Sequence, residues 1–337
     1  MVSGNNASIA HAAVCFSDKN GRYYKEALVT ACSVFANASC PVRLHIVHDD
    51  TLTAEARAAF EALVDGGEAG HGVEFHHALP VPPDVRERNR LGAGAWYRLM
   101  LPSLVDADRV LYLDADVVCE YDVKELSRYD IGNYLLGVVP FGRKKLTELV
   151  AVMRLDKDRY FNDGVLLMNC KKIREERPSF MEDIFAIYLK CPPGQADQEA
   201  MNIYCNKDPE ALFFLPEECN FRVWMGDHAV LPGGEYQGKI VHFSGHKGWQ
   251  ENTPAALLYW KYRERLFPGE RVAEYLLTIP LHPDGYLFAC LLRTRWLRSL
   301  ARLWADVEAG GVWKAILRRA AIGSLKKKGR KKLRKDA

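Results

Sequence analysis

Short apolar runs alternate with amphipathic segments through the first part of the chain. Four runs have the aliphatic and β-branched composition of buried strands: 8–17, 43–48, 73–77 and 109–113. Three segments between them carry apolar residues at helical spacing: 24–38, 53–63 and 96–104. Strands that alternate with helices in this way predict an α/β fold, with a mainly parallel sheet in a nucleotide-binding domain.

The pattern becomes shorter and less regular in the second part of the chain. Four more apolar runs predict strands: 135–139, 165–169, 213–215 and 239–243. Helical spacing predicts three helices: 144–154, 175–189 and a short one that opens at 197. We therefore expect one α/β domain over residues 1–250, a helical connector over 251–292 and a separate tail over 293–337.

Charge distinguishes the tail from the rest of the chain. The net charge of +3 over 337 residues conceals an asymmetry: residues 293–337 hold 15 basic and 3 acidic residues, and the remainder holds 31 basic and 40 acidic ones. Trp296, Leu300 and Trp304 recur at helical spacing among arginines. A basic amphipathic helix of this kind predicts binding to an anionic membrane surface. The alternative is a packing helix with a solvated end; the acidic body argues against a nucleic-acid partner.

Other features of the composition bear on the compartment. The first residues lack the basic and long apolar regions of a signal peptide, and no apolar run approaches the ~20 residues of a spanning helix. The nine cysteines are scattered without a CxxC pair, which is typical of a reduced compartment. We expect a cytoplasmic protein, peripheral on the inner face of the plasma membrane.

Two carboxylates follow the strand predicted over 109–113. Asp114 and Asp116 come at its carboxyl end, where open α/β sheets bind ligands. Carboxylates buried without a partner are costly, so a cation is expected to meet them. Two other pairs of this spacing precede the strand or lie in a polar loop, and we assign them to turns and surface: Asp106 with Asp108, and Asp156 with Asp158.

A histidine at the end of the strand predicted over 239–243 adds a further candidate ligand. His242 is followed by Gly245 and Lys247. Manganese accepts imidazole beside oxygen ligands, a glycine permits close approach of the backbone, and a lysine can neutralise a phosphate. Taken singly, His242 is better explained as a core histidine and Lys247 as a solvated lysine. Together with Asp114 and Asp116 they form a consistent set of metal and phosphate ligands.

Four blocks of the sequence, in order, resemble the signature blocks of glycosyltransferase family 8: YLDADV, FNDGVLLMN, DQEAMN and HFSGHKGW. Members of that family are retaining, metal-dependent sugar transferases, among them bacterial lipopolysaccharide glucosyl- and galactosyltransferases. The resemblance covers roughly residues 9–249. It implies the GT-A fold, a single nucleotide-binding Rossmann-like domain, and it makes residues 1–250 the catalytic part.

The resemblance also implies roles for particular residues. A Mn²⁺ ion, or Mg²⁺ in its place, would be held by three residues: Asp114, Asp116 and His242. The UDP-sugar donor would be contacted by six: Asp18, Asn20, Arg98, Ala115, Gly245 and Lys247. The donor sugar and reaction centre would lie beside four: Asn162, Asp163, Asp197 and Gln198. The implied reaction moves glucose or galactose from UDP to a glycan or glycolipid such as lipopolysaccharide.

Several points stay open at this stage. Asp163 stands where the family often has a small residue, Glu199 replaces a frequent aspartate, and Gly248 replaces a frequent proline. Tyr23 or Tyr24 would have to supply the aromatic ring that stacks on uracil.

The route to retention is also open. Gln198 is a poor nucleophile and favours front-face attack, whereas Asp163 and Asp197 leave double displacement possible. Two other functions are alternatives: a metal-dependent nucleotidyl or phosphoryl transferase, although no GxxxxGK[ST] phosphate loop is present, and a non-catalytic membrane adaptor.

Overall fold

The computed structural model describes most of the first three quarters of the chain: residues 9–65, 69–88, 92–142, 150, 153, 155–191, 197–223, 236–245, 247–248 and 254–268. The chain divides into two units, Met1–His246 and Lys247–Ala337. The first unit holds both sheets, and the second unit holds one described helix, α9 (Pro254–Leu266).

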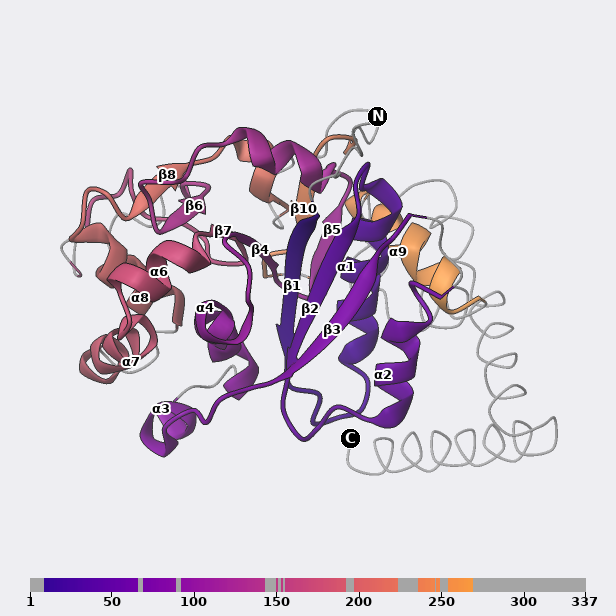
Figure 1. The fold of residues 1–337 in the computed structure, drawn as a ribbon, viewed down its shortest axis with the longest axis horizontal. Coiled ribbons are helices and arrows are strands. Elements are labelled where there is room, and N and C mark those ends of the chain that lie inside the picture. Colours follow the sequence, from indigo (N-terminus) through magenta and orange to yellow (C-terminus); the bar gives the residue numbers. More distant parts are fainter. Residues whose placement is uncertain are drawn as a thin grey trace, which may run out of the picture. The chain divides into compact units, whose positions relative to one another are not determined.

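A seven-stranded sheet forms the centre of the first unit, in the order β3-β2-β1-β4-β7-β6-β8 (Figure 1). Its strands are β1 (Ala10–Phe16), β2 (Val42–His48), β3 (Gly72–His77), β4 (Val110–Leu113), β6 (Leu136–Val138), β7 (Val165–Met168) and β8 (Leu212–Phe214). All run parallel except β7, which is antiparallel to β4 and β6. The prediction of a mixed, mainly parallel sheet is confirmed. The runs in β1 and β4 are apolar because both faces are covered.

A second, three-stranded sheet has the order β5-β10-β9. It comprises β5 (Val117–Cys119), β9 (Phe221–Arg222) and β10 (Ile240–His242). Strand β10 pairs antiparallel with β5, and His242 stands opposite Val117. Because β5 begins directly after Asp116, this register brings His242 to the turn between β4 and β5 that carries Asp114 and Asp116, called the acidic turn below. Neither β5 nor β9 was predicted as a strand, since each is only two or three residues long.

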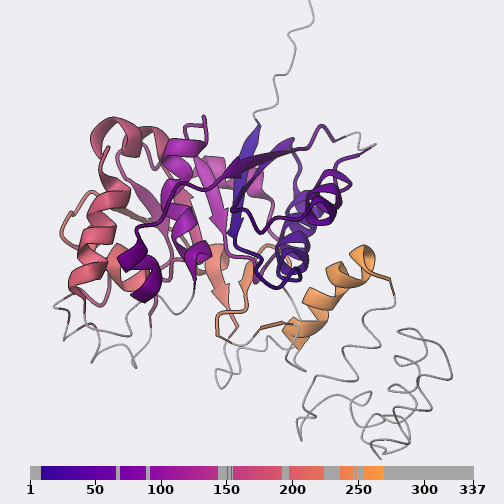
Figure 2. The same cartoon turned by 90° about the horizontal axis from the view of Figure 1, so that it is seen from below.

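Helices cover both faces of the large sheet. One layer contains α1 (Tyr24–Asn37) and α2 (Ala54–Glu61), which lie together against the strands β1–β3 (Figures 1 and 2). The other described elements of the first unit are α3 (Pro83–Arg88), the 3₁₀ helix η1 (Ala93–Met100), α4 (Leu101–Leu104), η2 (Val123–Arg128), α6 (Cys170–Glu176), α7 (Phe180–Lys190), α8 (Asp197–Asn206) and η4 (Glu217–Asn220). On the other face of the sheet, Trp96 of η1 packs edge-on against Phe185 and Tyr188 of α7.

Two prolines correct the helix predictions. The helix expected over 175–189 is two helices, because Pro178 lies between the end of α6 and the start of α7. The helix expected over 96–104 changes from 3₁₀ to α at Leu101, and Pro102 lies in the first turn of α4. Proline is tolerated in a first turn, where its missing N–H is not needed, so Pro102 opens a helix instead of ending one.

Some predictions fall on residues outside the described part of the chain. These are the tail over 293–337, nearly all of the helix over 144–154, and the connector apart from α9. Among the residues that are described, no helix combines the length and apolarity needed to cross a bilayer. The eight cysteines that are described are buried free thiols.

Candidate functional site

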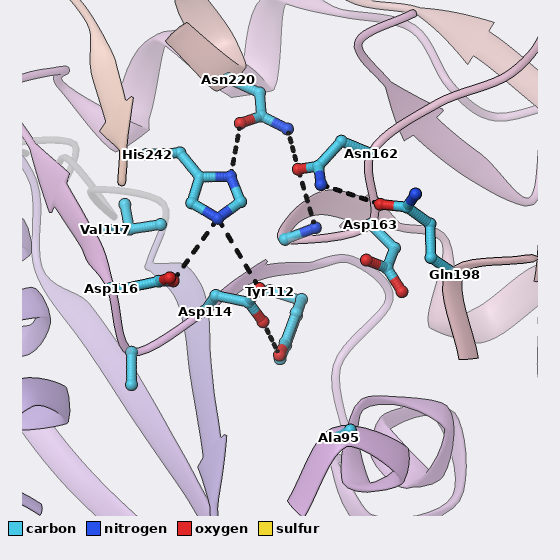
Figure 3. A network of polar contacts seen from close by, with 12 residues as sticks. Ala95, Tyr112, Asp114, Asp116, Val117, Asn162, Asp163, Gln198, Asn220 and His242 are labelled. Atoms are coloured by element: carbon cyan, nitrogen blue, oxygen red, sulfur yellow. Dashed lines mark hydrogen bonds and ion pairs between the residues drawn. The ribbon is translucent and has the colours of Figure 1, made fainter. Parts of the chain in front are cut away.

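The two predicted carboxylates and the predicted histidine converge at the carboxyl end of β4 (Figure 3). Nε2 of His242 lies 3.8 Å from Oδ2 of Asp114 and 3.4 Å from Oδ1 of Asp116. Asp116 and His242 are buried, and Asp114 keeps 24% of its side chain exposed. The three ligand atoms face one shared point that is reached from solvent on the Asp114 side.

A glycine permits this convergence. A Cβ atom built on Gly164 would lie 2.2 Å from Cε1 of His242 and 2.7 Å from Oδ2 of Asp114. The carbonyl of Gly164 also accepts a hydrogen bond from the amide of Asp114 at 2.8 Å. Any larger residue at 164 would therefore displace two of the three candidate ligands.

Hydrogen bonds determine which nitrogen of His242 faces the carboxylates. The backbone N–H of Gly164 donates to Oδ1 of Asn162, which fixes that oxygen as an acceptor. Nδ2 of Asn220 donates to the same oxygen at 3.0 Å, so Oδ1 of Asn220 points to Nδ1 of His242, also at 3.0 Å. Nδ1 therefore carries a proton, and Nε2 is the nitrogen that faces the carboxylates. Hydrogen bonding of this kind orients histidine ligands in metal sites.

The chain of amides continues away from His242 in one direction. Nδ2 of Asn162 donates to Oε1 of Gln198 at 2.9 Å, and Nε2 of Gln198 donates to the hydroxyl of Tyr160 at 2.8 Å. Tyr160 in turn donates to Glu199 at 3.1 Å. Each amide side chain and the Tyr160 hydroxyl both donates and accepts along this chain. Because the carboxylate of Glu199 can only accept, it fixes the orientation of the Gln198 amide.

A buried arginine gathers the carboxylates on the other side of the site. The guanidinium of Arg98 lies 3.3 Å from Asp114, 3.0 Å from Asp163 and 3.3 Å from Asp197. It also lies over the ring of Tyr112, whose hydroxyl donates to Asp114. Arg98 thus connects one candidate metal ligand to two of the predicted reaction-centre residues.

The charges around Arg98 do not balance. Burial raises the pKa of Asp163 well above its ordinary value, and burial likewise raises the pKa of Asp197; Arg98 opposes both shifts, and neighbouring carboxylates such as Asp114 add to them. A single guanidinium is shared among three carboxylates here, and Asp116 lies nearby. Added positive charge would therefore be stabilised at this place.

Hydroxyl side chains of helix α1 hold the backbone of the acidic turn and of the start of β5. The hydroxyl of Thr30 donates to the carbonyls of Val117 at 2.7 Å and Ala115 at 3.1 Å. The hydroxyl of Ser33 accepts from the amide of Cys119 at 2.8 Å. Both hydroxyls are fully buried, so they fix the backbone between the carboxylates and β5. Ala115 itself is buried and offers no polar side chain.

The loop after β1 contains two of the six predicted donor contacts, Asp18 and Asn20. The carboxylate of Asp18 accepts hydrogen bonds from the amides of Arg22 and Tyr23 at 2.8 Å, and so organises the start of α1. Asn20 is exposed. Tyr24 is buried and donates to Glu55, whereas Tyr23 is 39% exposed. Of the two tyrosines considered for stacking on a base, only Tyr23 is accessible.

Tyr23 also lies near the acidic turn. Burial of its hydroxyl raises its pKa, and the charges of Asp116 and Asp114 raise it further. Gly245 follows β10 with φ of 99°, a left-handed conformation that favours glycine. Lys247 belongs to the second unit, so its predicted contact with a phosphate stays a prediction.

Two further groups of residues bear on the prediction of this site: the aspartates assigned to turns and surface, and site residues that the sequence pattern did not indicate. The four aspartates assigned to turns and surface are exposed, and Asp156 accepts from the amide of Asp158 in such a turn. Several residues of the site were not predicted: Thr30, Tyr112, Tyr160, Gly164 and Asn220. Gly164 lies inside a recognised block and could have been suspected, but nothing local to Asn220 or Thr30 signals their contacts.

The three convergent residues fit a divalent metal ion. Asp114, Asp116 and His242 each offer one ligand atom, and these atoms lie within 4.8 Å of one another. Two carboxylate oxygens and an imidazole are ligands that divalent metal ions accept, and the hydrogen bond at Nδ1 leaves Nε2 available to coordinate. The lack of balancing charge around Arg98 agrees with a cation at this point.

Comparison with known proteins identifies the class and then the family. The galactosyltransferase LgtC, solved in complex with donor and acceptor sugar analogues, superposes with a TM-score of 0.61 at 22% identity, covering 78% of this chain and 99% of that one. The fold is thus the GT-A fold of glycosyltransferases. Residues 14–253 match the model of glycosyl transferase family 8, and the protein belongs to that family, as its four blocks suggested.

Two curated relatives match parts of the chain. The glycosyltransferase GlyF of Streptococcus pneumoniae serotype 4 is 27% identical over half of this chain and 42% of its own length. The lipopolysaccharide 1,2-glucosyltransferase of Escherichia coli strain K12 is 33% identical over 34% of this chain and 33% of its own length. This chain therefore spans less than half the length of either relative.

Proposed function

We propose that this protein is a retaining hexosyltransferase that moves glucose or galactose from a UDP-sugar to a glycan or glycolipid acceptor in a Mn²⁺-dependent reaction. The observation that carries the proposal is the convergence of Asp114, Asp116 and His242 at the carboxyl end of β4. Membership of glycosyl transferase family 8 supports the reaction class, and the lipopolysaccharide glucosyltransferase among the relatives supports the kind of acceptor.

Asp114, Asp116 and His242 would hold the metal ion. Bound there, the ion would supply positive charge against the diphosphate as the UDP leaves. Thr30 keeps the acidic turn in place through the backbone carbonyls, and Asn220 holds His242 in the coordinating tautomer. The ligands are thus fixed before the donor binds, and little reorganisation is needed during the reaction.

Several residues beside the acidic turn would bind the nucleotide. Tyr23 is accessible for stacking on uracil, and Asn20 is exposed in the same loop. Asp18 accepts hydrogen bonds from backbone amides. We therefore propose that it maintains the conformation of this loop in addition to contacting the nucleoside. Gly245, with its left-handed backbone after β10, would lie against the diphosphate; a role for Lys247 as its counter-charge is proposed from the resemblance to the family alone.

The contacts of the carboxylates favour front-face attack over double displacement. Asp163 and Asp197 are both buried, and each has one carboxylate oxygen paired with Arg98, which makes that oxygen less available as a nucleophile. The carbonyl oxygen of Gln198 is held in one orientation by Asn162. An oriented amide oxygen can stabilise positive charge at the sugar without forming a bond to it.

The tail over 293–337 lies outside the described residues, and its role is proposed from its charge and periodicity alone. We propose that it holds the enzyme on the anionic inner face of the plasma membrane, where a lipid-linked acceptor would be found. Loss of vesicle binding when residues 293–337 are removed is the expected result. Equal binding with and without these residues would contradict this part of the proposal.

A donor screen tests the central proposal. The full chain is incubated with UDP-glucose, UDP-galactose and related donors with Mn²⁺ or with EDTA, and the nucleotide product is identified. We expect free UDP from one preferred donor, and we expect Asp116→Ala to lower the rate by roughly 1,000-fold, since a metal supplies several kcal/mol of charge stabilisation. Asp156→Ala, in an exposed pair of the same spacing, is the matched control and should keep full activity.

Two results would overturn the proposal. Release of pyrophosphate from a nucleoside triphosphate, with UDP-sugars left intact, would indicate a nucleotidyl transferase instead. The absence of Mn²⁺-dependent UDP binding in calorimetry would indicate a protein without transferase activity. The configuration of the product, determined by NMR, decides whether the transfer is retaining.

A further inference from the structure

A row of imidazoles crosses the outer strands of the large sheet. His11, His45 and His76 belong to the three adjacent strands β1, β2 and β3, and Glu74 stands directly opposite His45. Nδ1 of His11 lies 3.0 Å from Nε2 of His45, and Nδ1 of His45 lies 3.0 Å from Nε2 of His76. The four residues share one face of the sheet because residues two apart on a strand point the same way.

This row is separate from the transferase site. Tyr112, Ala13, His45 and Glu74 are successive partners in the register of β4, β1, β2 and β3. His45 is therefore two strands away from the strand that carries the acidic turn, a lateral distance of about 10 Å. None of the four residues enters the hydrogen-bond chain that runs from His242 to Glu199.

Three of these side chains have the separations of metal ligands. Nδ1 of His45 and Nε2 of His76 lie 3.5 Å and 3.9 Å from Oε2 of Glu74, and the two nitrogens are 3.0 Å apart. Ligand atoms about 2.1 Å from a tetrahedral zinc ion are about 3.4 Å from one another. The triangle of His45, Glu74 and His76 thus has the size of one face of such a tetrahedron.

The surroundings complete the arrangement. When Nδ1 of His45 coordinates, its Nε2–H can donate to Nδ1 of His11, which is the second contact that metal-bound histidines make. The other oxygen of Glu74 lies 3.4 Å from Nε of Arg43, which leaves Oε2 for the metal. Two of the three ligands, His45 and Glu74, therefore have a partner on their far side.

Exposure rises across the triangle. The side chain of His45 is 2% exposed, that of His76 18% and that of Glu74 48%. An ion would thus have a buried nitrogen ligand on one side and solvent on the other. The exposed side chain of Glu74 places this end of the triangle at the surface, where water could take the fourth position.

We propose that His45, Glu74 and His76 form a second divalent-metal site, of the zinc class, that joins the edge strand β3 to β2. Two imidazoles and one carboxylate are the ligand set of zinc in many proteins, and imidazole-rich sites select zinc over manganese or magnesium. The ion would replace the proton between His45 and His76. The site differs in chemistry from the oxygen-rich cluster at Asp114 and Asp116.

Calorimetric titration with Zn²⁺ tests the proposal on the full chain, without a polyhistidine tag. The Asp116→Ala variant removes the first cluster and leaves one Zn²⁺ per chain to be measured. Adding His76→Ala should weaken the remaining binding by at least about 100-fold. Adding His77→Ala instead should leave it unchanged, since His77 is on the same strand, faces the other way and contacts Asp50.

A second measurement separates binding from a change in folding. Zn²⁺ should raise the melting temperature of the Asp116→Ala chain and of its His77→Ala derivative, but not of its His76→Ala derivative. His76 is partly exposed, so its replacement should not prevent folding; Glu74→Gln offers an even more exposed second test. Equal Zn²⁺ affinity in the His76→Ala and His77→Ala derivatives, or no Zn²⁺ binding in the Asp116→Ala chain, would overturn the proposal.

Discussion

The cluster at Asp114, Asp116 and His242 and the cluster at His45, Glu74 and His76 are built from similar residues but are supported differently. In the first, His242 is the end of a chain of five hydrogen bonds that reaches Glu199, and the backbone beside it is fixed by Thr30. In the second, the histidines contact mainly one another, on a face that opens to solvent.

The difference in support implies a difference in purpose. A site that stabilises a transition state needs its ligands held to a fraction of an ångström before substrate binds. A site that only links strands can tolerate looser ligands. The first cluster should therefore be sensitive to changes at a distance, and the second only to changes of its own ligands.

Among changes outside the ligands themselves, replacing Gly164 should give the largest effect. In Gly164→Ala the new methyl group would overlap His242 and Asp114, and a displacement of about 1 Å costs roughly 100-fold in rate. We expect at least that loss of Mn²⁺-dependent turnover, measured as UDP release. In the control variant Gly132→Ala, the added Cβ meets only the exposed Asp130 side chain, and the rate should be unchanged. Zn²⁺ binding at His45 should persist in both.

Removing the support of His242 should be the next largest. Asn220→Ala leaves Nδ1 of His242 without its acceptor and Asn162 without a donor. Loss of such a partner typically weakens metal binding by about 10- to 100-fold. The measurement is the Mn²⁺ concentration that gives half-maximal activity, with Asn206→Ala as the control, since Asn206 ends α8 and its side chain contacts the backbone of Asp156. An unchanged Mn²⁺ requirement would show that the chain does not orient His242.

The second cluster should reveal itself in the pH dependence of stability. Burial, together with the charges of His76, His11 and Arg43, lowers the pKa of His45 to about 3; Glu74 lies on the same face. The unfolded chain binds a proton near pH 6.5 and the folded chain does not, so stability falls as pH drops from about 6.5 towards 3.

At pH 5 this loss should amount to about 2 kcal/mol in metal-free protein. In His45→Asn that part of the pH dependence should disappear, although the variant is less stable at every pH. Urea unfolding with EDTA at pH 5 and pH 7.5 measures the effect, and His77→Asn serves as the control. An equal slope in wild type and His45→Asn would mean that His45 is protonated in the folded state.

The smallest effect is expected at the far end of the hydrogen-bond chain. Glu199→Gln keeps the shape but allows the amide to donate, so that Tyr160 and Gln198 can reverse their directions. We expect roughly a two- to tenfold fall in kcat with little change in KM for the donor, as for one rearranged hydrogen bond. Glu210→Gln, at an exposed position, is the control. A fall in thermal stability alone would assign Glu199 a purely structural role.

Much of the fold follows from local pattern. The strands β1, β2 and β4 were predictable because each is a continuous apolar run. The break at Pro178 and the helix that begins just before Pro102 were not predictable. Proline ends or begins a helix according to its neighbours. Strands as short as β5 and β9 are defined by pairing partners far away in the sequence.

The sequence by itself determined the acidic turn and the family of this protein, because Asp114 and Asp116 directly follow a buried strand and the four blocks keep their order. Only the tertiary structure decided which groups meet. Register placed His242 beside Asp116 and aligned His45 with Glu74, and a shift of one residue would turn these side chains to the other face. The amide of Gly164 sets the direction of the amide chain through a local contact with Asn162, but Asn162 meets Asn220 and Gln198 only once distant segments have folded together.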